Sequence, residues 1–263
     1  MWTSEHKPIV GVFGFSGCAG DQLRLIHMED ELVSLFTTAE IKFFHMAQSH
    51  QEVEHVDIAL VEGSINTKKQ LEELKEIREK STFLVALGTC ACFGGIQYLN
   101  EKDEAFEERF RHVYGSNIKK KEFIVGEAIP PQPLCNFVKV DAMVPGCPIE
   151  KDNLLPIYTK LIKGIRPQKY PAPVCVECKL EGNDCLLLHG IPCIGPVVSA
   201  GCGAICPSHN LPCVGCWGPY EAANYKSMID KLEEIGVDKE TALRKIKLFG
   251  GSKAEEELEK VIK

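Results

Sequence analysis

The chain has 263 residues, a hydrophobic content of 44% and a formal net charge of −7 at pH 7. This length can bury a sizeable core and leaves room for a second, smaller domain. The acidic balance argues against the broad basic face that nucleic acid or an anionic membrane would require.

The sequence indicates a cytoplasmic protein with an unusual cysteine content. No apolar run is long enough for a helix to cross a bilayer, and residues 1–8 lack the features of a secretory leader. There are 13 cysteines, and eight of them fall between Cys175 and Cys216. Because the cytoplasm is reducing, clustered cysteines there ligate metal more often than they form disulfides.

Five short apolar segments in the first 165 residues predict the strands of a parallel sheet. They are largely apolar on both faces, as buried parallel strands are, and stretches with helical spacing lie between them. The segments are 9–15, 41–47, 56–61, 83–87 and 138–144. Strands that alternate with helices favour an α/β fold built on a doubly wound parallel sheet.

Four of these segments run into loops that carry a thiol or a carboxylate close to a glycine. The residues are Cys18, Asp21, Glu62, Cys90 and Cys147. The carboxyl ends of parallel strands form one crevice, so we expect these side chains to converge. Three cysteines and one acid suit a single four-coordinate iron–sulfur cluster. Two other cysteines, Cys92 and Cys135, are interpreted as small buried apolar residues.

Spacing alone leaves the roles of the two acids open. Asp21 stands three residues after Cys18, where a Cys-x-x-Cys loop would place its second thiol, but it could instead cap the following helix. Glu62 could likewise be a buried polar residue at the site or the acid of a turn or helix start.

A Pro-rich segment at 169–173 predicts a linker, and a Cys-, Gly- and Pro-rich stretch follows it to residue 219. We expect this stretch to need metal in order to fold. It holds two sets of four cysteines, each with one Cys-x-x-Cys pair: Cys175, Cys178, Cys185 and Cys193, then Cys202, Cys206, Cys213 and Cys216. The spacing fits two structural zinc sites or two [4Fe–4S] clusters, and we favour the clusters.

These motifs, in this order, resemble the small subunit of a soluble, multimeric [NiFe]-hydrogenase, in particular the delta subunit of archaeal sulfhydrogenases. The resemblance covers nearly the whole chain and rests on the Cys18 loop, on 61–64, 88–91 and 145–148, and on the cysteines of 175–216. It implies a flavodoxin-like domain over 1–165, a two-cluster iron–sulfur domain over 166–219 and a helical C-terminal extension over 220–263. We expect that extension to form two or three helices that pack on the first domain or on a partner.

The resemblance implies three [4Fe–4S] clusters and two kinds of partner. The proximal cluster would lie on Cys18, Asp21, Cys90 and Cys147, the distal cluster on Cys175, Cys178, Cys185 and Cys193, and the medial cluster on Cys202, Cys206, Cys213 and Cys216. Electrons would pass between a large subunit that carries the Ni–Fe site and a flavin- or iron–sulfur-containing subunit linked to NAD(P). No catalytic residue is expected in this chain, although Glu62 is a candidate for proton transfer.

One departure from the family pattern matters. The usual first loop is Cys-x-x-Cys, and here Asp21 takes the place of the second thiol. The resemblance therefore predicts a carboxylate ligand, whose iron should be the easiest to lose. Two alternatives to a hydrogenase subunit stay open: an iron–sulfur subunit similar to the small cluster-bearing subunit of respiratory complex I, and a zinc-stabilised binding module.

Overall fold

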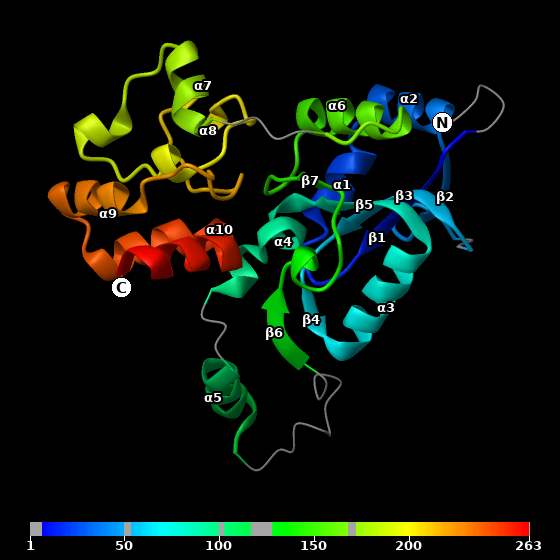
Figure 1. Ribbon diagram of the computed structural model, residues 1–263, viewed down its shortest axis with the longest axis horizontal. Coiled ribbons are helices and arrows are strands. Elements are labelled where there is room, and N and C mark those ends of the chain that lie inside the picture. The colour runs from blue at the N-terminus through cyan, green and yellow to red at the C-terminus, as the bar shows by residue number, and fades with distance from the viewer. Residues whose placement is uncertain (1–6, 50–53, 100–102, 117–127, 168–171, 263) are drawn as a thin grey trace.

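Five parallel strands form a sheet in the N-terminal part of the chain (Figure 1). The structure is a computed structural model that describes residues 7–49, 54–99, 103–116, 128–167 and 172–262. The strands are β1 (Ile9–Gly14), β2 (Glu40–Phe44), β3 (Val56–Glu62), β5 (Ser81–Leu87) and β7 (Ala142–Val144). Their order, β2-β1-β3-β5-β7, is that of flavodoxin-like sheets, so the predicted parallel α/β sheet is confirmed.

The register of the central strands aligns the loops that follow them. Gly14 at the end of β1 pairs with Glu62 at the end of β3, and Glu62 pairs with Leu87 at the end of β5. All seven residues of β3 are buried, which accounts for its continuous apolar run. The fifth predicted strand is shorter than expected, because β7 begins only at Ala142.

Helices pack on both faces of the sheet. On one face, α1 (Gly20–Ile26), α2 (Asp30–Thr38) and α6 (Lys151–Ile162) lie together, and residues of α1 and α6 share a core with Leu60 of β3 (Figure 1). On the other face, α3 (Lys68–Glu79) and α4 (Gly88–Phe93) pack against Ala59 and Val61. Successive residues of β3 thus point to opposite faces, as the period of a strand requires.

Several elements of this part were not predicted. A two-stranded antiparallel ribbon pairs β4 (Ile65–Thr67) with β6 (Ala128–Gln132). The others are the short helices η1 (Gly95–Tyr98) and η4 (Leu134–Asn136) and the helix α5 (Asp103–Tyr114). The six N-terminal residues and most of the predicted linker at 169–173 lie outside the described residues.

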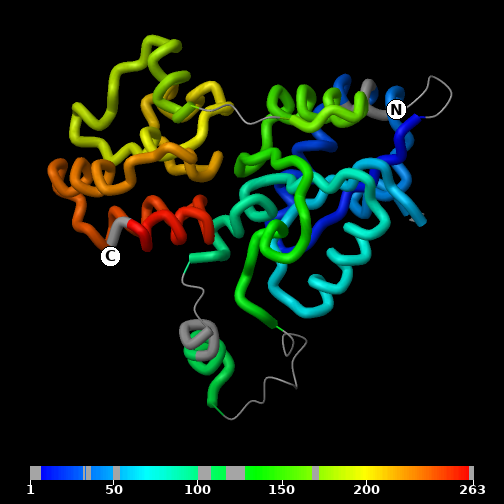
Figure 2. The backbone as a smooth tube through the Cα atoms, viewed as in Figure 1, coloured from blue at the N-terminus to red at the C-terminus, as the bar shows by residue number. Residues whose placement is uncertain are grey.

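The Cys-rich segment and the C-terminal helices form one lobe (Figure 2). Its elements are α7 (Val174–Leu180), η5 (Leu186–His189), η6 (Gly195–Val197), α8 (Ile205–Ser208), α9 (Tyr225–Glu234) and α10 (Lys239–Ile262). Side chains such as Ile194 and Val197 share a hydrophobic core with Met228 and Leu232 of α9. The expectation that the C-terminal helices pack on the first domain or a partner is therefore incomplete, because they also supply the core of the Cys-rich segment.

The last helix also joins the two lobes. Helix α10 is interrupted at Gly251, whose φ is 51°, and a β-carbon there would collide with the carbonyl oxygen of Phe93 in α4. Beyond this kink, Glu255 accepts a hydrogen bond of 2.8 Å from the Tyr98 hydroxyl. Although α10 has 24 residues, neither it nor any other helix of the described ranges is long and apolar enough to span a bilayer.

A buried ion pair fastens α3 to the edge of the sheet. Nη1 of Arg78 lies 2.6 Å from Oδ2 of Asp141, whose side chain is only 4% exposed. The other end of the guanidinium donates to the carbonyl oxygen of Ser81 at 2.6 Å. The same carboxylate oxygen accepts the N–H of Leu84 at 3.0 Å, so the pair connects α3, β5 and the start of β7.

Replacing Arg78 with Met should lower the free energy of unfolding by about 3 kcal/mol, because the Asp141 carboxylate would stay buried without its closest cation. Lys69→Met is the control: Lys69 is exposed and pairs with Glu73 one turn away on the same helix, an interaction that contributes about 0.5 kcal/mol at most. Anaerobic urea unfolding followed by circular dichroism measures both. Equal, small effects would show that the pair does not stabilise the fold.

Candidate metal centres

The loops after β1, β5 and β7 converge on one site at the carboxyl end of the sheet. Cys90 belongs to α4, directly after β5, and its pKa is raised to about 12, first by burial and then by negative groups that face it. Those groups are Cys147, Asp21, Cys18 and Glu62. The four residues predicted for the proximal site are therefore brought together, with Glu62 beside them.

Asp21 is inside the site and does not cap the helix. It is the second residue of α1, after Gly20, and no side chain caps that helix from the N-cap position. Its side chain is buried, and Oδ1 accepts the N–H of Ile149 at 2.8 Å. Its second oxygen, Oδ2, lies against Gly88, whose φ of 80° and missing β-carbon make room for the carboxylate.

The buried carboxylate of Asp21 has little to stabilise its negative charge. Burial raises the pKa of Asp21 to about 7; the N–H of Ile149 works against this rise, and the nearby charge of Glu62 adds to it. A bound cation would remove both the cost of burial and the repulsion. The donor set of three thiols and one carboxylate therefore fits an iron–sulfur cluster. When such a cluster binds, its iron would replace the protons of these four side chains.

Glu62 has a definite structural role. Its side chain is 2% exposed, and its two oxygens accept the N–H groups of Asp21 at 3.3 Å and Gln22 at 3.2 Å. These are amides of the first turn of α1, where a negative charge is favourable. Glu62, at the end of β3, thus stabilises the start of α1 through these two hydrogen bonds. It also lies beside the proximal site.

The first set of the Cys-rich segment gathers around α7. Burial raises the pKa of Cys175 to about 11, and the thiols of Cys193, Cys178 and Cys185 add to the rise. A β-carbon on Gly195 would lie 3.3 Å from the sulfur of Cys175 and 3.7 Å from that of Cys193. All four predicted residues of the distal set therefore face one another.

The second set surrounds a cavity. Burial raises the pKa of Cys216 to about 12, and the neighbouring thiols that add to the rise are Cys202, Cys206 and Cys147. A cavity of about 150 Å³ is lined by five cysteines: Cys147, Cys202, Cys206, Cys213 and Cys216. Within the described residues, no three ligating side chains stand close enough together to hold one metal ion.

Direct contacts connect the three sets in a row. The Thr89 hydroxyl, next to Cys90, lies 2.6 Å from the carbonyl oxygen of Cys216 and 2.8 Å from that of Gly146. At the other end, the N–H of Cys213 donates to the sulfur of Cys193 at 3.3 Å. The medial set is therefore in contact with the proximal set on one side and with the distal set on the other.

The side chains of Cys92 and of two histidines in the Cys-rich segment have partners other than these thiols. Cys92 is 1% exposed and its thiol donates to the carbonyl oxygen of Ala86, which agrees with the interpretation as a small buried residue. Cys135 is exposed, so the same interpretation was wrong for it: it lies in η4, at the surface. His189 pairs with Asp184, and His209 with the carbonyl oxygen of Ile205.

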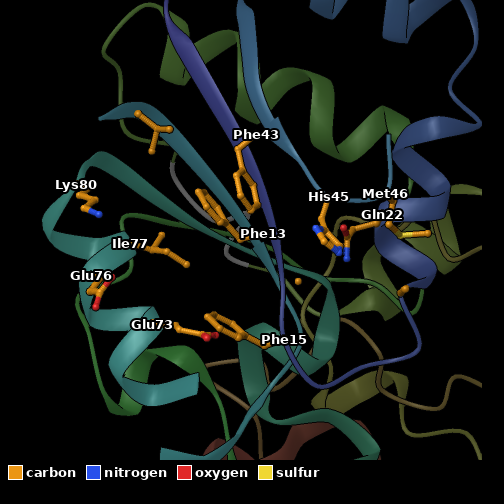
Figure 3. Close-up of a pocket in the computed structure, with 13 residues that line it drawn as sticks. Phe13, Phe15, Gln22, Phe43, His45, Met46, Glu73, Glu76, Ile77 and Lys80 are labelled. Atoms are coloured by element: carbon orange, nitrogen blue, oxygen red, sulfur yellow. The ribbon is translucent and has the colours of Figure 1, made fainter. Parts of the chain in front are cut away.

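A separate, open pocket of about 600 Å³ lies between β1, β2 and α3 (Figure 3). Phe13 and Phe43 stack at 4.5 Å in its wall, and Gln22 and His45 lie together at one end. No thiol lines it, but it includes Ala19, the neighbour of Cys18. Glu73, Glu76 and Ile77 of α3 form the opposite wall, so the pocket lies between the sheet and this helix.

Comparison with known proteins places this arrangement in a family. Residues 18–161 match the family model described as NADH ubiquinone oxidoreductase, 20 Kd subunit. Sulfhydrogenase 2 subunit delta of Pyrococcus furiosus is 40% identical over 241 residues, which cover 91% of this chain and 98% of that protein. A subunit of the F420-non-reducing hydrogenase of Methanocaldococcus jannaschii is 33% identical over 234 residues, covering 80% of this chain and 81% of that protein.

Solved structures have the same fold. A chain of the actinobacterial-type NiFe-hydrogenase from Ralstonia eutropha H16 has a TM-score of 0.59 at 16% identity, covering 98% of this chain and 91% of that one. A chain of an H2-reduced NAD+-reducing [NiFe]-hydrogenase has a TM-score of 0.51 at 22% identity, covering 62% and 95%. The chain belongs to the family of hydrogenase small subunits that includes these archaeal relatives and shares its first domain with the 20 kDa subunit of NADH ubiquinone oxidoreductase, and it is a subunit of an oxidoreductase.

Proposed function

We propose that the chain relays electrons through three [4Fe–4S] clusters as the small subunit of a cytoplasmic [NiFe]-hydrogenase. The proximal cluster is held by Cys18, Asp21, Cys90 and Cys147, the medial cluster by Cys202, Cys206, Cys213 and Cys216, and the distal cluster by Cys175, Cys178, Cys185 and Cys193. The observation that carries the proposal is the continuous row of three thiol sets. The family model ends at residue 161, whereas the hydrogenase relatives extend over most of the chain, which favours a hydrogenase over a subunit similar to that of complex I.

The medial cavity supports clusters over single zinc ions. Four thiolates on one zinc, with bonds of about 2.3 Å, would have their sulfurs only about 3.8 Å apart and leave no cavity. The space of about 150 Å³ bordered by five cysteines suits a larger inorganic body. Bound clusters supply one-electron redox chemistry.

The residues around the clusters would control their exposure to water and their spacing. Cys90, Cys175 and Cys216 are half-buried, which limits the access of water to their thiols. The contacts of Thr89 and Cys213 fix the spacing between neighbouring sites. Cys18 and Cys147 are exposed, so the proximal site is open on one side, and this opening is where we place the large subunit.

We place the acceptor subunit, which carries flavin or iron–sulfur centres and is linked to NAD(P), beyond the distal set. The row of contacts has two ends, and the distal set is the one away from the sheet. Exposed apolar side chains lie near it, including Leu180 and Leu188, and suit a protein partner.

Metal analysis of anaerobically purified protein tests the function. We expect about twelve iron and twelve sulfide per chain, corresponding to three [4Fe–4S] clusters, together with a nickel-containing partner. About two zinc ions and no sulfide would instead correspond to two structural Cys₄ sites and would rule out the electron-transfer function.

Substitution of Asp21 tests the mixed ligand set. Asp21→Ala should remove one iron from the proximal cluster and convert its electron paramagnetic resonance signal to that of a three-iron form, because only three protein ligands remain. Asp21→Cys should retain four irons and change the reduction potential, since thiolate binds iron more covalently than carboxylate does. An unchanged proximal spectrum in Asp21→Ala would show that Asp21 is not a ligand.

The open pocket beside Cys18 offers a test of where the large subunit binds. An apolar segment of that subunit would fill the pocket and pack against Phe13 and Phe43. Met46→Glu places a charge in the pocket without disturbing the core, since Met46 is 43% exposed, and should reduce the amount of large subunit recovered with this chain at least tenfold. Ile165→Glu, at an exposed site away from the pocket, is the matched control. Equal recovery from both variants would exclude the pocket from the interface.

A further inference from the structure

Glu177 connects two of the cysteine sets. It lies in α7, between Cys175 and Cys178 of the distal set. Its carboxylate, however, contacts the loop of the medial set: Oε1 accepts the N–H of Gly201 at 2.8 Å, and Oε2 lies 3.9 Å from the sulfur of Cys202. One oxygen therefore fixes the side chain, and the other places negative charge beside a thiol of the medial site.

This charge is not neutralised within the part of the chain that the structure describes, where Glu177 forms no ion pair.

We propose that Glu177 lowers the reduction potential of the medial cluster and is a positioning residue for the electron relay. The inference rests on the proposed function, because it requires a cluster on the medial set. Reduction adds an electron to the cluster, and a fixed carboxylate beside one of its sulfurs opposes that added charge. An electron would therefore spend less time on the medial cluster than it would without this charge.

The test is Glu177→Gln in the intact hydrogenase complex. Glutamine retains an oxygen for the N–H of Gly201, removes the charge and places an N–H group near the sulfur of Cys202, which favours the reduced cluster. At a fixed solution potential, the ratio of reduced to oxidised medial cluster should rise roughly tenfold, an upward shift of about 59 mV for one electron. Redox titration followed by electron paramagnetic resonance measures this shift, which should be smaller at the distal cluster and smallest at the proximal one.

Two further variants separate charge from structure. Glu181→Gln removes an exposed carboxylate just after α7 and should leave the medial potential unchanged. Glu177→Ala removes both the charge and the hydrogen bond, so a medial potential raised in Ala and Gln alike supports the proposal.

A wild-type potential in Glu177→Gln, with iron lost only from Glu177→Ala, would show a purely structural role and overturn it. The absence of all cluster signals from the wild-type complex would instead overturn the proposed function itself.

Discussion

The structure depends on one constraint: in the part of the chain that the structure describes, acidic groups at the ends of strands and in the Cys-rich segment are gathered in buried or half-buried positions, where burial disfavours their charged forms. Cys90 and Cys216 have pKa values raised to about 12, Cys175 to about 11 and Asp21 to about 7, in each case mainly by burial. When so many acidic groups lie together away from water, they must either stay protonated or bind a cation that neutralises their charge. Metal binding would replace the protons, so the assembly of the clusters would be coupled to the folding of these loops.

The fold meets this constraint by bringing distant segments to the same row of sites. The register of β1, β3 and β5 sets the proximal loops side by side, and Thr89 links them to Cys216, 127 positions further along the chain. The Cys-rich segment has few large side chains, and α9 and α10 supply much of the core that it lacks. Because α10 also contacts α4 at Gly251 and η1 through the bond from Tyr98 to Glu255, the lobe that carries two sets is held against the lobe that carries the third.

Much of this could be predicted from the sequence because it depends on local patterns. Apolar runs such as that of β3 predicted the strands, and the spacing from Cys175 to Cys216 predicted two sets of four thiols. The role of Asp21 could not be decided from spacing, because a helix cap and a ligand occupy the same position in the sequence. Its hydrogen bond comes from Ile149, 128 residues away.

Other features lie beyond any local pattern for the same reason. The ribbon of β4 and β6 and the packing of α9 on the Cys-rich segment depend on contacts between segments far apart in the chain. The exposure of Cys135 was predicted wrongly, because the sequence around a single cysteine does not indicate whether that cysteine is buried. Glu177 was not singled out, since its neighbours in sequence belong to one set and its carboxylate contacts another.

Asp21 and Glu177 show how the same arrangement can have two effects. Each carboxylate gives one oxygen to a backbone N–H, of Ile149 or of Gly201, and leaves the other beside the thiols. Asp21 stands at a ligand position, where a cluster would share its charge directly. Glu177 stands beyond a ligand, where its charge acts on the cluster only through space. A backbone amide therefore orients both acids, and in the proposed function their positions decide whether the carboxylate would bind iron or would only change the potential of the cluster.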